Sequence, residues 1–87
     1  MFNLDIASQA ARELKKIPKQ HRNSIRIVLR ELKEDPAIGK PLGRELTGKY
    51  AVKIGVYRII YQINFKDKIV YVSTAGHRST VYKRIHR

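Results

Sequence analysis

The sequence has no cysteine and no tryptophan, only 7 acidic residues among 87, and no long hydrophobic run. The absence of cysteine excludes disulfide bonds and thiolate metal sites, and it fits a cytoplasmic protein. No apolar stretch approaches the ~20 residues that a helix needs to span a bilayer, and the N-terminus lacks the layout of a signal peptide. These absences predict a cytoplasmic protein that does not use a membrane.

What is present is enough for a folded protein. A length of 87 residues corresponds to one domain, residues 1–87, because there is no room for a second core. Hydrophobic residues make up 43% of the chain and are spread along it, which distinguishes the protein from a disordered basic tail.

Lysine and arginine dominate the charge, since 19 basic residues against 7 acidic ones give a formal net charge of +12. The excess is concentrated in the second half, where residues 46–87 contain 9 basic residues and a single acid, Asp67. A field of that sign favours polyanions, so nucleic acid, a ribosomal surface or an acidic protein is the expected partner. A basic surface that serves only solubility is the alternative.

The first half of the chain has the periodicity of one strand and two helices. Residues 2–6 alternate apolar and polar side chains, as a strand does, and Ser8 is placed to cap a helix that runs to about Ile17. Apolar residues recur at helical spacing between about Lys19 and Glu34, which predicts a second helix. Asp35-Pro36 should end it, because the residue before a proline disfavours helical geometry.

Residues 36–49 are predicted to form a long loop, and an antiparallel meander should follow it. The loop contains two prolines and three glycines, and we expect Leu42 and Leu46 to pin it to the core. The fold class is therefore α+β: an N-terminal strand, a two-helix hairpin, a three-stranded meander and a short C-terminal tail. The meander is predicted from three runs rich in β-branched and aromatic residues, Tyr50–Ile54, Tyr57–Ile63 and Ile69–Thr74.

Alternation along the middle run separates Arg58 from its aromatic neighbours. Tyr57 and Tyr61 fall on the face that the two helices can cover. Arg58 and Gln62 fall on the opposite, uncovered face, and so does Lys53 of the preceding run. Polar residues are ordinary on the solvated face of an antiparallel sheet. Solvation of that face does not by itself explain an arginine in the middle of the most apolar strand, where a smaller polar residue would serve. We therefore interpret Arg58 as an exposed functional residue.

Two short motifs lie in the second half: GVYRIIYQI at residues 55–63 and GHRSTVY at residues 76–82. Together with the order strand, two helices, meander, they resemble the RelE/ParE superfamily of toxin–antitoxin toxins, and the RelE branch matches better. The resemblance covers nearly the whole chain. It implies a ribosome-dependent endoribonuclease whose open sheet face enters the ribosomal A site and cuts mRNA, without a metal or other cofactor. It also implies a hetero-oligomer with an acidic antitoxin encoded by a neighbouring gene.

The resemblance assigns residues as well. The strand arginine of the family matches Arg58, the arginine after the sheet matches Arg78, and the terminal tyrosine matches Tyr82. The family has paired lysines in the strand before the hairpin turn. Lys53 matches one of them, and Ala51 stands where the other would be.

These side chains suit metal-free RNA cleavage, in which a 2′-hydroxyl attacks the neighbouring phosphate. The reaction needs a base, an acid for the leaving 5′-oxygen, and cations for the developing negative charge. Arg58 and Arg78 suit the third role, and Lys53 could add charge or act as a base. Tyr82 could stack on a base or orient the hydroxyl. His77 titrates near neutrality and could transfer a proton, or it could be a bystander beside Arg78. Further RNA contacts are expected from Lys49, Gln62, Lys83 and Arg84.

Two other functions stay open at this point. A ParE-type inhibitor of DNA gyrase would share the fold without the arginine and tyrosine constellation, and a simple nucleic-acid-binding module would need only the charge. The sequence offers no Gly-rich phosphate loop, no carboxylate pair and no metal-ligand motif of histidine with aspartate or glutamate.

Overall fold

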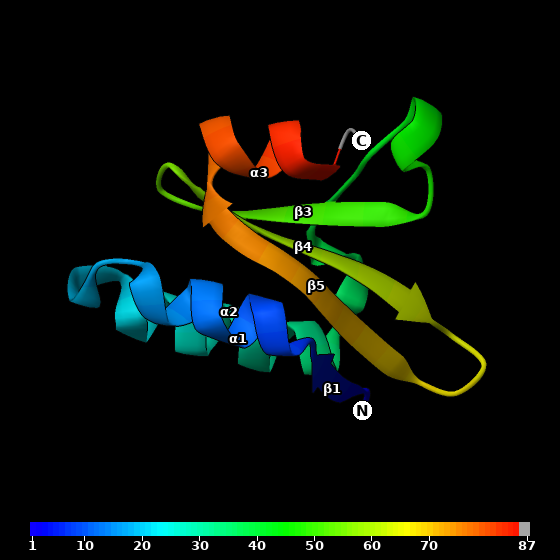
Figure 1. Ribbon diagram of the computed structural model, residues 1–87. Helices are drawn as coiled ribbons and strands as arrows, with labels where there is room; N and C mark the ends of the chain where they lie inside the picture. Colours follow the sequence, from blue (N-terminus) through cyan, green and yellow to red (C-terminus); the bar gives the residue numbers. More distant parts are fainter. Residues whose placement is uncertain (86–87) are drawn as a thin grey trace.

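The computed structural model describes residues 1–85. They form a five-stranded mixed sheet with helices on both faces (Figure 1). The strand order is β1-β5-β4-β3-β2. β1 runs parallel to β5, and every other neighbouring pair is antiparallel. The predicted α+β class is confirmed. The elements are β1 (Asn3–Ile6), α1 (Ser8–Lys16), α2 (Arg22–Glu34), β2 (Lys40–Pro41), β3 (Lys49–Ile54), β4 (Tyr57–Asn64), β5 (Ile69–His77) and α3 (Arg78–Ile85), with short 3-10 helices at Lys19–His21, Pro36–Ile38 and Arg44–Leu46.

Helices α1 and α2 pack on one face of the sheet, and α3 lies across the other (Figure 1). The larger core lies under α1 and α2, where Ala10 and Leu32 of the helices meet Ile59, Tyr61 and Val72 of the strands, all fully buried. This is the face that alternation assigned to the helices.

None of the helices within residues 1–85 is long and apolar enough to cross a membrane.

The starts of both predicted helices differ from expectation. A 3-10 helix occupies Lys19–His21, so α2 begins at Arg22 and not at Lys19. Ser8 is the first residue of α1 and not its cap, because Ala7 occupies the capping position and no side chain caps the helix. The predicted serine cap was therefore wrong. Asp35 ends α2 as predicted, and its carboxylate accepts a hydrogen bond from the backbone N–H of Ala37 at 3.1 Å.

Tyr61 anchors the segment between α2 and β3. Its hydroxyl donates to the carbonyl of Pro36 at 2.7 Å and accepts from the N–H of Gly39 at 2.9 Å. Burial raises the pKa of Tyr61 above its ordinary value, although the Gly39 hydrogen bond opposes the shift. Glycine is needed at position 39, because an added Cβ would lie 2.4 Å from the tyrosine hydroxyl. Leu46 is buried and Leu42 packs on the smaller core, as expected.

The C-terminal tail is a helix, and it partly covers the face that was expected to be open. Val81 of α3 is fully buried against Ala51 and Ile60, with Leu42 and Ile85 packed around them. Only the part of that face beyond α3 stays accessible, and the prediction of an uncovered face was wrong to this extent. The last two residues, 86 and 87, lie outside the described part of the chain.

Candidate functional site

Three of the predicted site residues line one hollow on the α3 face. Lys53, Arg58 and Tyr82 border a space of about 380 Å³, together with Lys40 and the backbone around Gly39. Lys53 and Arg58 are opposite each other in the register of β3 and β4, so their side chains share a face. Tyr82 reaches the hollow from α3. We call this space the basic hollow.

Arg58 is buried in the wall of the basic hollow, which corrects the expectation of an exposed arginine. The residue is only 8% exposed, and its Nη1 atom donates to the carbonyls of Gly55 at 3.0 Å and Tyr57 at 2.9 Å. Within residues 1–85, all hydrogen bonds of this guanidinium run from Nη1. Nε and Nη2 are therefore available to an anion, in an orientation that the β3–β4 turn fixes.

Arg78 lies at the same end of the sheet but outside the lining of the basic hollow. It is the first residue of α3, its side chain is exposed, and its backbone N–H donates to the carbonyl of Val56 at 2.9 Å. Gly76 sits just before it with a φ of 155°, and a Cβ there would come within 3.2 Å of Val81. A glycine at this position therefore lets α3 turn back closely onto the sheet.

His77 lies on the opposite face of the sheet from Lys53 and Arg58. Its Cα lies opposite Tyr57 in the register, and the two rings meet edge-to-face at 5.8 Å between centroids. The ring of Tyr57 in turn contacts His21, at 5.3 Å, on the side of the sheet that carries α1 and α2. The Nδ1 atom of His77 also lies 2.8 Å from the hydroxyl of Ser79. The structure therefore does not bring His77 into the basic hollow.

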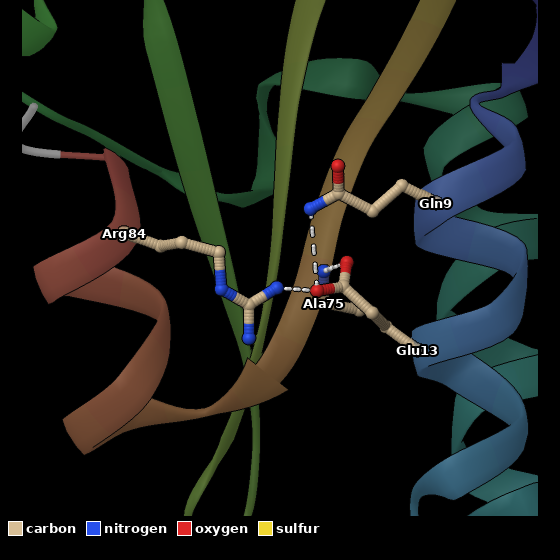
Figure 2. A network of polar contacts seen from close by, with 4 residues as sticks. All are labelled: Gln9, Glu13, Ala75 and Arg84. Atoms are coloured by element: carbon tan, nitrogen blue, oxygen red, sulfur yellow. Dashed lines mark hydrogen bonds and ion pairs between the residues drawn. The ribbon is translucent and has the colours of Figure 1, made fainter.

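Arg84 is engaged in an internal ion pair rather than free on the surface. It pairs with Glu13 of α1, whose other oxygen accepts the backbone N–H of Ala75 in β5 at 3.2 Å. Figure 2 shows Gln9 and Glu13 reaching from α1 and Arg84 reaching from α3, so that the carboxylate joins both helices to the edge of β5. This network holds α3, and hence Tyr82, in place.

The remaining predicted RNA contacts are spread over the same face and over α3. Lys49 and Gln62 are opposite each other in β3 and β4, on the face of Arg58, and Gln62 is exposed. Lys83 is exposed on α3. No group of three or more histidine, aspartate or glutamate side chains within residues 1–85 is arranged to hold a metal ion.

Comparison with known proteins places the chain in a family. A family model for the ParE toxin of type II toxin–antitoxin systems, parDE, matches residues 4–82. The chain belongs to this family of toxins. The sequence resemblance to the RelE/ParE superfamily is thereby confirmed.

Individual relatives of this toxin carry RelE-type names. Toxin RelG of Mycobacterium tuberculosis is 29% identical over 85 residues, covering 95% of this chain and 98% of that protein. The crystal structure of the toxin–antitoxin complex RelBE2 from M. tuberculosis contains a chain with a TM-score of 0.78 and 29% identity, covering 88% of this chain and 98% of that one. The isolated Escherichia coli RelE toxin matches with a TM-score of 0.75 and 27% identity, over 98% of this chain and 99% of that one.

Sequence reasoning missed Glu13 in this toxin. The residue lies three positions after Ala10 and four before Ile17, so it falls on the apolar stripe of α1. An acid at a stripe position predicts a buried partner, because an unpaired buried carboxylate is costly. Identifying Arg84 as that partner required the fold, since α3 was not predicted.

Proposed function

We propose that the protein is a ribosome-dependent endoribonuclease that cleaves mRNA in the A site and so inhibits translation. The observation that carries the proposal is the convergence of Lys53, Arg58 and Tyr82 on the basic hollow, with Arg78 at the same end of the sheet. The supporting comparison is the likeness to RelE-type toxins over nearly the whole chain.

The chemistry is transfer of a phosphate ester within the RNA. The 2′-oxygen attacks the adjacent phosphorus and loses its proton, the bond from phosphorus to the 5′-oxygen breaks, and that oxygen takes up a proton. The products are a 2′,3′-cyclic phosphate and a 5′-hydroxyl. Arg58 would hold the phosphate oxygens, and Lys53 would stabilise the added negative charge or accept the proton. Tyr82 would orient the nucleotide. No metal ion takes part in this scheme.

An acidic antitoxin is the proposed protein partner. Solved relatives include complexes of RelE toxins with RelB antitoxins, from M. tuberculosis and E. coli. The net charge of +12 favours a partner of opposite sign, and oppositely charged surfaces mainly speed association. The antitoxin would cover the basic hollow or displace α3, forming a hetero-oligomer in the cytoplasm, where translating ribosomes are found.

Cleavage of a defined message on translating ribosomes tests the proposal. Purified toxin should break the message inside codons, and naked RNA of the same sequence should be cut poorly. A message with a single 2′-deoxy nucleotide at the cut position is the matched control and should survive at that position. Equal cleavage of naked and ribosome-bound RNA would reject the ribosome-dependent mechanism.

Inhibition of DNA gyrase is the second candidate, because the matching family model is named after ParE. The two candidates are separated by running a gyrase supercoiling assay beside the cleavage assay. Loss of supercoiling with intact messages would replace the proposal by gyrase inhibition.

A further inference from the structure

Four side chains form a row across the sheet, on the α3 face but four residues along the strands from the row of Lys53 and Arg58. Asp5 of β1 lies opposite Tyr71 of β5, Tyr71 lies opposite Gln62 of β4, and Gln62 lies opposite Lys49 of β3. Residues in register on neighbouring strands point to the same face. We call these four residues the sheet-face row.

Three of the four residues in the sheet-face row are exposed, Lys49 is half-buried, and their side chains have no polar partner within residues 1–85. Asp5 and Gln62 are exposed, and Tyr71 is 38% exposed. Within residues 1–85, none of the four side chains makes a hydrogen bond or an ion pair. An exposed aromatic ring between a free amide and a free carboxylate presents a stacking surface flanked by donors and acceptors.

A line of lysines joins the sheet-face row to the basic hollow. Lys49 precedes Lys53 by four residues along β3, about 13 Å at the rise of a strand, and both side chains lie on the same face. Lys40 of β2 lies opposite Ala51, between the two, and also borders the hollow. Three cations are therefore spaced along the β2–β3 edge, which suits a strand of phosphates running from the hollow to the row.

We propose that the sheet-face row is a nucleobase-binding subsite for the single-stranded RNA whose phosphate is cleaved in the basic hollow. The proposal rests on the nuclease function proposed above and extends it to a residue set that selects the sequence. The backbone of the RNA runs along Lys53, Lys40 and Lys49. A base near the cut stacks on Tyr71, as bases do on aromatic side chains of open sheets.

The row also predicts which base it prefers. A carboxylate only accepts hydrogen bonds, so Asp5 favours a base with an exocyclic amino group. Cytosine presents its N4 amino group where uracil presents an O4 acceptor. Gln62 can both donate and accept, and it does not discriminate in this way. The subsite therefore prefers cytosine to uracil.

Direct binding tests the subsite independently of catalysis. The probes are oligocytidylate and oligouridylate with 2′-fluoro groups, which lack the nucleophile, and binding is measured by fluorescence anisotropy near physiological salt. Wild type should bind the cytidine probe about fivefold more tightly. Asp5→Asn should make the two affinities about equal, because the asparagine amide can also donate. Tyr71→Ala should weaken both by about tenfold, and Tyr71→Phe should restore them. Ile27→Ala, an exposed apolar change on α2, is the control and should bind as wild type does.

Cleavage on ribosomes then places the subsite on the RNA. The cut positions of wild type and Asp5→Asn are compared over one message, and the preference for cytosine at a fixed position near the cut should be lost in the variant. Cleavage by wild type with unchanged cut positions and unchanged binding in Asp5→Asn and Tyr71→Ala would overturn the subsite while leaving the nuclease intact. RNA binding that depends on Tyr71, without any cleavage, would support the subsite and reject the nuclease. Loss of antitoxin binding in Tyr71→Ala, with cut positions intact, would assign this face to the protein partner and overturn the proposal.

Discussion

Replacing Arg58 with alanine should lower both stability and cleavage, for two separable reasons. The stability loss comes from the two hydrogen bonds that Nη1 donates to Gly55 and Tyr57 across the β3–β4 turn. Hydrogen bonds from a charged group contribute roughly 1.5–3 kcal/mol each. Because Gly55 is exposed and its carbonyl can bind water instead, we expect a total loss of about 2 kcal/mol.

That loss is measurable without unfolding the protein at 25 °C. A domain of this size has a free energy of unfolding of roughly 4–13 kcal/mol, so the variant stays folded. Its Tm should fall by roughly 8–16 °C, since each kcal/mol shifts the Tm of a domain this small by about 4–8 °C. Urea denaturation followed by circular dichroism should show a lower midpoint with an unchanged slope.

The loss of cleavage should exceed anything that the small unfolded fraction explains. Removing one charge-stabilising contact costs roughly 100-fold or more in rate. The assay is single-turnover cleavage on translating ribosomes at 25 °C. Lys53→Ala is the matched control on the neighbouring strand: its side chain is exposed, so its stability should stay within about 0.5 kcal/mol while cleavage still falls.

Arg58→Lys separates the two roles further, because lysine keeps the charge but cannot hold a phosphate bidentately. Cleavage by Arg58→Ala at the wild-type rate would refute the assignment of Arg58 to the site. An unchanged Tm would refute the hydrogen bonds to the turn.

Four further changes test the rest of the site. Arg78→Ala should cut roughly 100-fold more slowly and keep its urea midpoint, because the side chain is exposed. His77→Ala should lose less than the roughly 100-fold expected of a proton-transfer residue, since its ring lies across the sheet from the hollow; a larger loss, together with a changed pH–rate profile, would return it to the site. Glu13→Gln should destabilise the fold and expose α3 to proteolysis, and adding Arg84→Ala should cost little more if the two side chains act as a pair. Tyr61 has a raised pKa in the folded state, so the stability that its neutral hydroxyl contributes is complete below pH 10 and is lost as the pH rises above that value. Tyr61→Phe should be less stable than wild type at neutral pH, and its stability should fall less steeply as the pH rises above 10.

The helices α1 and α2 and the strands of the meander could be predicted because apolar residues recur several times at a regular spacing in each of them. The period-2 alternation of β4 placed Tyr61 under the helices and Arg58 on the other face, and both assignments hold. The helical spacing of apolar residues likewise predicted a second helix, and Leu32 of α2 is fully buried. Such patterns report which side of an element is apolar, and they carry no information about what the polar side faces.

Two features without such repetition could not be predicted. Helix α3 spans only Arg78–Ile85, and Val81 and Ile85 are its main apolar contacts, too few to establish a helical period. Because the helix was missed, Arg58 was expected in solvent. The parallel pairing of β1 with β5 also lacks a local signal, since it depends on how α1 and α2 return the chain to the sheet edge.

One extra residue in β5 decides on which side of the sheet His77 lies. Ile60 lies opposite Thr74 and the next residue, Tyr61, lies opposite Val72, so Ser73 is left without a partner in the register. A bulge of this kind inverts the alternation of every residue beyond it. Without it, positions 71 and 77 would share a face, because they are an even number of residues apart. With it, Tyr71 stays on the α3 face and His77 turns to the helix side, while Gly76 comes to lie opposite Arg58. The bulge therefore keeps the imidazole out of the basic hollow and places a glycine opposite Arg58, at a position where Val81 packs closely. For the nuclease that we propose, catalysis would accordingly rest on cations and on positioning, with the proton transfers left to Lys53 or to groups that the ribosome supplies.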